Sequence, residues 1–551
     1  MRRVLILAMM LAVTGAVHAI GNAASQAAPV RCGTGWLKSE HAAGRMTLPR
    51  AMAPGAAKRT QDTTIEVGTE LLFAVSGRGL MAAVCQRVGE HSYVFVENRH
   101  WDTNGGSVLQ SHVDKLGELF DASSPADPSR GVYELETEAF GDPADVDGDG
   151  RIFLLVLNVS SPDIVGYFDP AVATHDIPEY RRDVLFLDET FLRRNSQLSL
   201  GTLAHEFQHL IHWHHDNDEE PWIDEGLSGY AEELVGYPEA DPEAVPEFLK
   251  RPHTSLTDWN FLDSARHYGV TYLFSSYLAE VYGPGLIREL VAHPRNGTAG
   301  LDAAFAARNL TDRFLDVWQQ WMVGNYASKD ERYGYGALGE RQAANIDTVR
   351  TLPLQDAAGA ISGRYGSAAI LFRTPGDVFV DFVGDSIGRY SVWTYAMHSA
   401  GAELQQVAID ADNHGVAQLT GIDSVVVIVG RTSQQGLNFQ LSARAFTPTV
   451  IAETSSVLPA VAMLGPAFPN PFNSSVRIPY AIADAGDVGV TVFDLLGRQV
   501  RILASGWHVP GRYEVTWDGL DGVGRSVASG VYLTRLQVAG RERVSTLALI
   551  R

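Results

Sequence analysis

The sequence predicts a multidomain protein of the α+β class, and three observations support this prediction. The chain has 551 residues, more than the roughly 250–300 at which a single hydrophobic core stops growing. Strand-like and helical runs alternate up to about residue 196, helical periodicity follows up to about 345, and short β runs with Gly turns fill the rest. Hydrophobic residues make up 45% and charged residues 20% of the chain, as in ordinary globular proteins.

The first residues predict export. Two arginines open the chain, an apolar run follows at 4–17, and small residues around Ala19 suit cleavage of a signal peptide. That run is too short to span a bilayer comfortably, and no later stretch is long and apolar enough to form a transmembrane helix. We therefore expect the protein to leave the cytoplasm without stable membrane insertion.

The remaining divisions follow from composition and periodicity. Residues 20–62 are rich in Ala, Gly and Pro and lack a sustained period, so they are predicted to be a flexible lead-in or pro-segment. Continuous apolar runs at 152–159 and 184–187 predict strands that are covered on both faces. The predicted divisions are a signal peptide at 1–19, the lead-in at 20–62, an α/β part at 63–196, a helical part at 197–345, a β domain at 346–447, a linker at 448–466 and a C-terminal β-sandwich at 467–551.

The charge and the cysteines restrict the partners. With 43 Lys and Arg against 65 Asp and Glu, the net charge is −22, and such a surface repels nucleic acid and anionic lipid. Cys32 and Cys85 are the two cysteines of the chain, and an even pair in an exported protein is compatible with one disulfide. Since no cysteine cluster exists, we expect any metal to be bound by His and carboxylate.

One predicted helix, at 200–215, carries the residues that point to catalysis, His205-Glu206-Phe207-Gln208-His209. Residues four apart on a helix stand one above the other, so His205 and His209 can bind a single ion. Glu206 lies beside them and can take a proton from metal-bound water and pass it to a leaving amine. The pattern therefore predicts catalytic Zn²⁺ with Glu206 as general base.

The third ligand is expected to come from the next helix. That helix is predicted at 222–236 and places Glu225 16 residues after His209. If the two helices pack together, the Glu225 carboxylate reaches the ion. Three protein ligands and a water are the usual arrangement of catalytic zinc.

A rival third ligand is His215, which has the spacing of the three-histidine metalloproteases called metzincins. That geometry needs a sharp turn, normally at a glycine, where this chain has His212. If the helix continues, His215 lies about 15 Å along the axis from His205 and cannot reach the same ion. We therefore favour Glu225 and expect His212, His214 and His215 to be solvated residues at the helix end.

The segments HEFQHLI (205–211) and PWIDEGLSGYAEEL (221–234) together resemble the hyicolysin-type neutral metallopeptidases of the gluzincin group. The resemblance runs from about residue 85 to 330. It implies a zincin-like catalytic domain, with a mixed-sheet subdomain and a helical subdomain. It also implies a zinc endopeptidase in which His205, His209 and Glu225 are ligands and Glu206 is the general base.

The chain departs from that resemblance at one position. Some gluzincins carry an Asp four residues after the ligand Glu, where it orients a histidine, but this chain has Gly229. Asp224 and Glu232 are the candidates for the orienting carboxylate. Related gluzincins also use a Tyr or His on a later helix to donate to the oxyanion, and Tyr268, which lies between His267 and Tyr272, is the predicted donor here.

An acidic loop at 145–151 suggests a second metal site. Asp145, Asp147 and Asp149 alternate with other residues, two of them glycines, just before a buried strand, and oxygen ligands at such positions suit Ca²⁺. An EF-hand would need a Glu at position 156, where this chain has Val156, so the loop is not an EF-hand. The competing interpretation is an ordinary acidic turn.

The C-terminal part has alternating strands with turn glycines, as in a small β-sandwich. Its motifs are FPNPFN (468–473), VFDLLGR (492–498), GRY (511–513), WDG (517–519) and GVY (530–532). They resemble the C-terminal sorting domains of type IX secretion cargo, which are similar to the immunoglobulin-like domain of flagellar hook-capping proteins. The resemblance implies delivery by the secretion machinery to the surface or surroundings of a Gram-negative-type bacterium. A plain accessory or binding domain is the alternative.

These features predict a secreted zinc endopeptidase that acts on protein or peptide substrates. One alternative is a metzincin-like peptidase with His215 as third ligand. Another is a surface protein that contains zinc but does not cut its partner. The intact Glu206 argues against the latter, because binding alone has no use for a general base.

Overall fold

The structure is a computed structural model, and its described part divides into two compact units. One consists of residues 1–214 and 231–243, the other of 215–230 and 244–551. The predicted signal peptide at 1–19 and residues 448–461 of the predicted linker lie outside the described residues. The described residues are 31–49, 64–161, 163–194, 196–237, 242–259, 264–327, 344–346, 348–351, 354–445, 462–483, 486–508, 511–522, 525–538 and 540–551.

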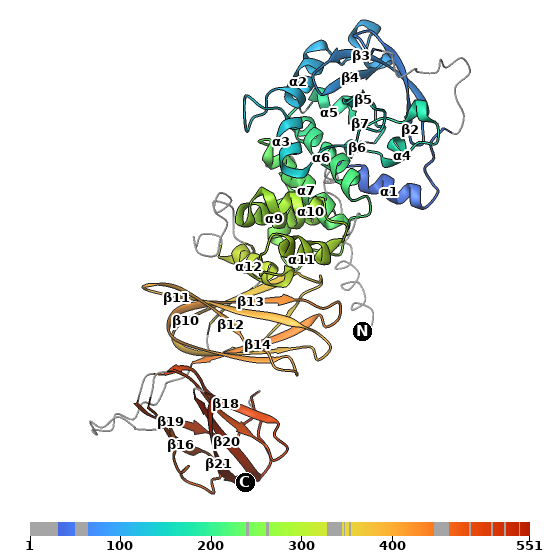
Figure 1. Cartoon of the computed structure of the whole chain (residues 1–551). Helices are drawn as coiled ribbons and strands as arrows, with labels where there is room; N and C mark the ends of the chain where they lie inside the picture. The colour runs from blue at the N-terminus through green and yellow to red at the C-terminus, as the bar shows by residue number, and fades with distance from the viewer. Residues whose placement is uncertain are drawn as a thin grey trace, which may run out of the picture. The chain divides into compact units, whose positions relative to one another are not determined.

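A seven-stranded mixed sheet forms the centre of the first unit, in the order β1-β6-β7-β5-β4-β3-β2 (Figure 1). β5 pairs in parallel with β4 and β7, and both β5 and β7 are fully buried. The apolar runs at 152–159 and 184–187 predicted such strands, and this prediction is confirmed. The strands are β1 (Arg31–Cys32), β2 (Glu70–Val75), β3 (Gly79–Val88), β4 (Ser92–Glu97), β5 (Ile152–Leu157), β6 (Ile164–Phe168) and β7 (Val184–Asp188).

Helix α6 packs against both the helices and the sheet of this unit. Its Phe207 ring lies 4.9 Å from the ring of Phe120 on α2 and 5.7 Å from that of Tyr133 on α3. At Gly166 of β6, an added Cβ would lie only 2.9 Å from the Thr202 side chain of α6, so the glycine permits this approach. The helices are α1 (Thr34–Ala42), α2 (Gln110–Asp121), α3 (Val132–Phe140), α4 (Pro170–Ala173), α5 (Glu189–Arg194) and α6 (Ser196–His215).

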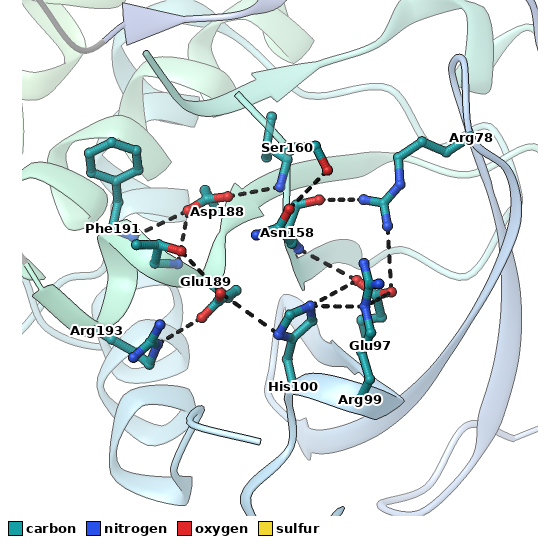
Figure 2. A network of polar contacts seen from close by, with 12 residues as sticks. Arg78, Glu97, Arg99, His100, Asn158, Ser160, Asp188, Glu189, Phe191 and Arg193 are labelled. Atoms are coloured by element: carbon teal, nitrogen blue, oxygen red, sulfur yellow. Dashed lines mark hydrogen bonds and ion pairs between the residues drawn. The ribbon is translucent and has the colours of Figure 1, made fainter. Parts of the chain in front are cut away.

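A polar network joins the carboxyl ends of β4, β5 and β7 to the start of α5 (Figure 2). His100 lies 3.4 Å from Glu97 and 3.7 Å from Glu189, and Arg193 pairs with Glu189 at 2.7 Å. Burial opposes ionisation of Glu189, but its hydrogen bonds from Arg193 and Thr190 outweigh that effect and lower its pKa. The network thus connects the start of α5 to the strand ends, and α6 begins two residues after α5 ends.

The N-terminal segment differs from the prediction of a flexible lead-in at 20–62. Residues 31–49 contain β1, which pairs in parallel with β6, and α1. Leu37 of α1 is 4% exposed and belongs to the core of the sheet. The segment completes an existing sheet edge and builds no core of its own, which is why its sequence shows no regular period.

The disulfide considered for Cys32 and Cys85 is wrong, because both are free thiols. β1, which carries Cys32, is at one edge of the sheet, whereas β3, which carries Cys85, is next to the opposite edge. Cys85 is fully buried, and burial raises the pKa of its thiol to about 11. It is therefore a core residue rather than half of a crosslink.

The second unit begins with helices. Gly226 and Gly229 of α7 face α9, and an added Cβ would lie 2.6 Å from Ser275 Oγ and 3.2 Å from Tyr272 Cβ, respectively. The sequence did not predict α8, which has only seven residues, or α11, which has two glycines in its first turn. The helices are α7 (Pro221–Leu234), whose last four residues belong to the first unit, α8 (Ala244–Lys250), α9 (Ser264–Tyr282), α10 (Pro284–Val291), α11 (Gly297–Ala307) and α12 (Phe314–Tyr326). None of the described helices is long and apolar enough to cross a membrane.

A second seven-stranded sheet follows, with the order β12-β11-β13-β10-β14-β9 and with β8 paired to β10. The long strand β10 spans the sheet, and its register shifts around Gly376 at φ 116°. The strands are β8 (Thr348–Thr351), β9 (Leu354–Ala360), β10 (Ser367–Gly384), β11 (Tyr390–His398), β12 (Gly401–Val407), β13 (His414–Arg431) and β14 (Asn438–Ala445).

The C-terminal part has two facing sheets, β15-β16-β19 and β18-β17-β20-β21. One core joins them, because Ile478 and Trp517 of the first sheet pack with Val492 and Leu547 of the second. Asn470 of the FPNPFN motif ties the entry to β21 through 2.8 Å hydrogen bonds with the backbone of residues 546 and 548. The strands are β15 (Met463–Leu464), β16 (Val476–Ile482), β17 (Gly486–Phe493), β18 (Gln499–His508), β19 (Gly511–Trp517), β20 (Gly530–Val538) and β21 (Arg541–Leu549).

Candidate metal centre

Helix α6 presents His205 and His209 on one face. The ring centroids of the two histidines are 4.9 Å apart, and both side chains are buried, as is Glu206 between them. The spacing of four residues produces this arrangement directly, because one helical turn separates the two imidazoles. α6 runs without a break from Ser196 to His215.

A carboxylate orients the first histidine. His205 Nδ1 lies 2.8 Å from Glu232 Oε1, which leaves Nε2 as the nitrogen available to an ion. Glu232 was one of the two candidates for this role, and Asp224 was the other. At Gly229, where some gluzincins have Asp, an added Cβ would lie 3.2 Å from Tyr272 Cβ, so a side chain there would require Tyr272 to shift slightly.

Four side chains converge to form a possible metal site. One ligand atom from each of Cys32, His205, His209 and Glu225 lies within 4.8 Å of the others. Two imidazoles, a carboxylate and a thiol are the donors that Zn²⁺ binds, usually in a tetrahedron. The expectation that His and carboxylate bind the metal did not include Cys32, which strand pairing with β6 brings to the histidines from a position far away in the sequence.

The other histidines of α6 stand apart from this group. His215 is the exposed last residue of the helix and is not among the four, as expected if α6 continues through His212. His214 is also exposed. His212 was expected to be solvated but is fully buried, and its Nδ1 lies 3.5 Å from Gln208 Nε2.

The carboxylate of Glu206 has two unlike oxygens. Oε2 accepts hydrogen bonds from Thr34 Oγ1 at 2.7 Å, from Phe168 N at 3.0 Å and from Cys32 Sγ at 3.5 Å. Oε1 is buried and has no hydrogen-bond partner among the described residues. A buried carboxylate oxygen normally has a partner, so a water or an ion beside the ligand group fits this atom.

Glu136 of α3 is a further acid beside the centre that the sequence did not reveal. It is completely buried, and neither of its oxygens has a hydrogen-bond partner among the described residues. Burial raises its pKa well above 4.5, the nearby Glu232 adds to this effect, and His205 opposes it. Ionisation of Glu136 is therefore disfavoured, which limits the negative charge around the histidines.

Tyr268, the predicted oxyanion donor, lies on α9. Its ring packs edge-on against Trp259, with the centroids 5.0 Å apart, and its side chain is half-buried. This aromatic contact fixes the ring, and the role of the hydroxyl stays a prediction.

The acidic loop forms a second group of possible ligands, with one difference from the prediction. Asp145 and Asp147 lie with Asp183, at the start of β7, so that one oxygen of each is within 4.8 Å of the others. Asp149, the third predicted ligand, accepts a hydrogen bond from the backbone of Arg151 instead and is not in the group. Sequence spacing alone did not predict Asp183, because it lies 34 residues after Asp149.

The surroundings of Asp183 disfavour its ionised form. It is 1% exposed, its Oδ2 accepts from Val146 N at 2.8 Å, and its Oδ1 has no hydrogen-bond partner among the described residues. Burial, with the charges of Asp147, Asp145 and Asp149, raises its pKa to about 8. A cation between these carboxylates would relieve the repulsion.

Comparison with known proteins relates the chain to metalloproteases. No protein-family model matches it. By sequence it is a distant homologue of one such enzyme, the neutral metalloprotease ShpI of Staphylococcus hyicus. The two are 25% identical over 327 residues, which cover 54% of this chain and 69% of that protein. This relationship indicates a hydrolase with a metal, typically zinc.

Solved structures add little. The pre-peptidase C-terminal domain of a Bacillus anthracis collagenase is 10% identical, with 18% of this chain and 97% of that chain covered and a TM-score of 0.16. PorZ, a surface component of the type IX secretion system of Porphyromonas gingivalis, is 26% identical, with 22% and 15% covered and a TM-score of 0.13. Likenesses with such low TM-scores carry no argument.

The protonation of Glu136 predicts how stability depends on pH. Between about pH 4.5 and its raised pKa in the folded state, the unfolded chain loses a proton that the folded chain keeps, so this residue makes the wild type less stable as pH rises. Glu136→Gln removes that penalty. We expect the variant and the wild type to melt together near pH 4 and the variant to melt higher at pH 7, by about 2–4 °C per kcal/mol of relief. Thermal unfolding between these pH values measures the effect, and a difference that does not change with pH contradicts it.

Proposed function

We propose that the protein is a secreted zinc-dependent endopeptidase with His205, His209 and Glu225 as ligands and Glu206 as general base. The observation that carries the proposal is the convergence of one ligand atom from each of these three ligands, with Glu206 on the same helix face. The distant homology to a neutral metalloprotease supports the same reaction class.

The residues of the chain divide the work of hydrolysis. Bound Zn²⁺ would supply an activated water and polarise the scissile carbonyl. Glu206 is placed to accept the proton of the attacking water through Oε1 and then to protonate the leaving amine. Phe168 N donates to Oε2 and so fixes the orientation of the carboxylate, and Glu232 fixes the ring of His205. Tyr268 is the proposed donor to the oxyanion.

We further propose that residues 467–551 deliver the enzyme to the bacterial surface or beyond. The resemblance of the FPNPFN and following motifs to sorting domains supports this role. The two-sheet fold, in which Asn470 binds the last strand, is also suited to a separate module. Export in turn makes calcium available to the acidic loop.

The acidic loop is proposed to bind Ca²⁺ through Asp145, Asp147 and Asp183. The unpartnered, buried Oδ1 of Asp183 supports this, since a carboxylate oxygen without a donor has a use for a cation. Gly148 and Gly150, at φ 77° and 72°, allow the loop to turn around an ion. The ion would join the loop to the start of β7 and thus stiffen the sheet that carries the catalytic subdomain.

Glu206→Gln tests the general base. The amide keeps the shape of the side chain but cannot accept the proton, so we expect kcat to fall by about 10²–10⁴-fold while the zinc content stays at one per chain. Casein hydrolysis and metal analysis on the same sample measure the two quantities. Cleavage at the wild-type rate would exclude this mechanism, and a chain that binds zinc but cuts no peptide even after residues 31–43 have been released would favour the surface binding protein.

Glu225→Ala and His215→Ala separate the two candidates for the third ligand. In a Cys32→Ala background, loss of the Glu225 carboxylate leaves two histidines of the four converging side chains, so zinc should be lost on dialysis against a weak chelator. His215→Ala should retain zinc and activity, because the residue is exposed at the helix end. Loss of zinc from His215→Ala, with zinc retained after the Glu225→Ala change, would support the metzincin-like arrangement.

The calcium proposal predicts a ligand-dependent rise in melting temperature. Ca²⁺ at 100 times its Kd should stabilise the fold by about 2.7 kcal/mol. Asp183→Asn should abolish this rise while changing the metal-free melting temperature little, because Asp183 is already largely protonated at pH 7. Asp149→Asn is the matched control and should preserve the rise. If Asp149→Asn abolishes it and Asp183→Asn does not, the ligands are those of the original loop pattern.

A further inference from the structure

The N-terminal segment, residues 31–43, lies along the candidate metal centre within the first unit. β1 extends the sheet at β6, with Arg31 opposite Ile164 and Cys32 opposite Gly166. Gly33 N then donates to Gly166 O at 2.9 Å. The segment thus takes the edge of β6 to which another extended peptide could otherwise add.

Two side chains of this segment reach the catalytic groups. Cys32 Sγ lies 3.4 Å from His209 Nε2, and Thr34 Oγ1 lies 2.7 Å from Glu206 Oε2. The backbone N–H of Thr34 points to Cys32 Sγ at 3.3 Å. Cysteine binds a metal as the thiolate.

Further contacts hold the segment in place. An added Cβ at Gly33 would lie 3.0 Å from Ile164 Cγ2 and 3.2 Å from Tyr167 Cβ, so the close contact with β6 depends on glycine. Thr34 is fully buried and exchanges hydrogen bonds with the backbone of Phe168 at 2.8 and 3.1 Å. These contacts fix the two residues that directly follow Cys32.

The helix that follows carries a second anchor. Leu37 packs into the core of the sheet. His41 Nε2 lies 2.9 Å from Ser76 Oγ and 3.3 Å from Asp169 Oδ1. The segment is therefore docked over its whole length, and Cys32 does not reach the centre as an isolated side chain.

We propose that the N-terminal segment is an inhibitory element in which Cys32 supplies the fourth ligand to the catalytic zinc. This proposal rests on the proposed function and adds its regulation. The sulfur takes the position that the attacking water needs, Thr34 hydrogen-bonds the general base, and β1 closes the edge of β6. The thiol releases its proton to solvent when it binds the metal.

Activation then requires that the segment leave the site. It remains on the chain after removal of the predicted signal peptide at 1–19, and residues 44–63 connect it to the rest of the first unit. A cut in this connection, for example between Lys58 and Arg59, converts the segment into a separate peptide that is held by non-covalent contacts alone. Loss of covalent attachment lowers its effective concentration at the site, so that it can dissociate.

Cobalt substitution tests the ligand independently of activity. Co²⁺ bound by a thiolate shows a charge-transfer absorption band in the near ultraviolet. We expect this band in the wild type and in Cys85→Ala, which removes the other thiol, and we expect its loss in Cys32→Ala with cobalt still bound. Absence of the band from the wild type, or its persistence in Cys32→Ala, would overturn the proposal.

Activity then tests the inhibition. At equal zinc content, Cys32→Ala should cleave casein at least about tenfold faster than the wild type, since the docked state loses its bond to the metal and the competent state becomes more populated. A specific protease site inserted between Lys58 and Arg59 gives a second test that needs no change in the centre. Cutting the folded protein there should raise activity and remove the cobalt band. Thr34→Val should keep the band.

The cobalt spectra and the activity measurements together show whether the peptidase function or the inhibitory role is wrong. If the cobalt band depends on Cys32 but neither the variant nor the cut protein hydrolyses peptides, the peptidase function is wrong and the thiolate ligand stands. If the wild type is as active as Cys32→Ala, the peptidase function stands and the inhibitory role is wrong.

Discussion

The close contact between helix α6 and strand β6 is the constraint on which the candidate centre depends. At Gly166 there is no room for a side chain, because an added Cβ would lie 2.9 Å from both Thr202 and the backbone oxygen of Phe186. Two residues further along β6, the N–H of Phe168 is therefore close enough to hold Glu206 at 3.0 Å. A larger residue at 166 would push α6 away and separate the general base from the group that orients it.

Charge is the second constraint on the centre. Glu136, Glu206 and Glu232 are gathered around the histidines of α6 within the first unit, in a setting where an uncompensated charge is costly. The fold limits that cost by raising the pKa of Glu136, by pairing Glu232 with His205 and by surrounding one oxygen of Glu206 with donors. A divalent cation would complete this compensation. The same reasoning applies to Asp183, whose ionisation is opposed by burial and by its acidic neighbours.

The sequence predicted those parts of the site that depend on local periodicity. Helix α6 with His205, Glu206 and His209 needs only the turn of the helix, and its continuation through His212 follows from the absence of a glycine there. Glu232 could be proposed because it is two turns from Glu225 on the next helix. The buried strands β5 and β7 were also predictable, because an apolar run without polar alternation has few other uses in a soluble domain.

The residues that the sequence did not reveal are joined to the site by tertiary contacts alone. Cys32 lies in a stretch without periodicity and reaches His209, 177 residues away, through strand pairing. Asp183 looked like the polar edge of an apolar run, and Glu136 like one of several acids on a short helix. The one feature of the sequence that could have pointed to the N-terminal segment is a cysteine followed by Gly and Thr near the start of a chain predicted to be exported. Because such a cysteine can also form a disulfide, the feature did not indicate a metal ligand.

Gly166 also links the centre to the N-terminal segment. Its backbone oxygen receives Gly33 N, and its position lies opposite Cys32, while its missing side chain admits α6. Gly166 thus affects two distances. It positions Cys32 relative to His209, and it sets how closely Glu206 of α6 approaches β6. The thiol is consequently held against the ligands only when the helix is seated as catalysis requires. The docked segment therefore keeps the centre assembled while blocking it, so that its departure uncovers a site that needs no rearrangement of α6.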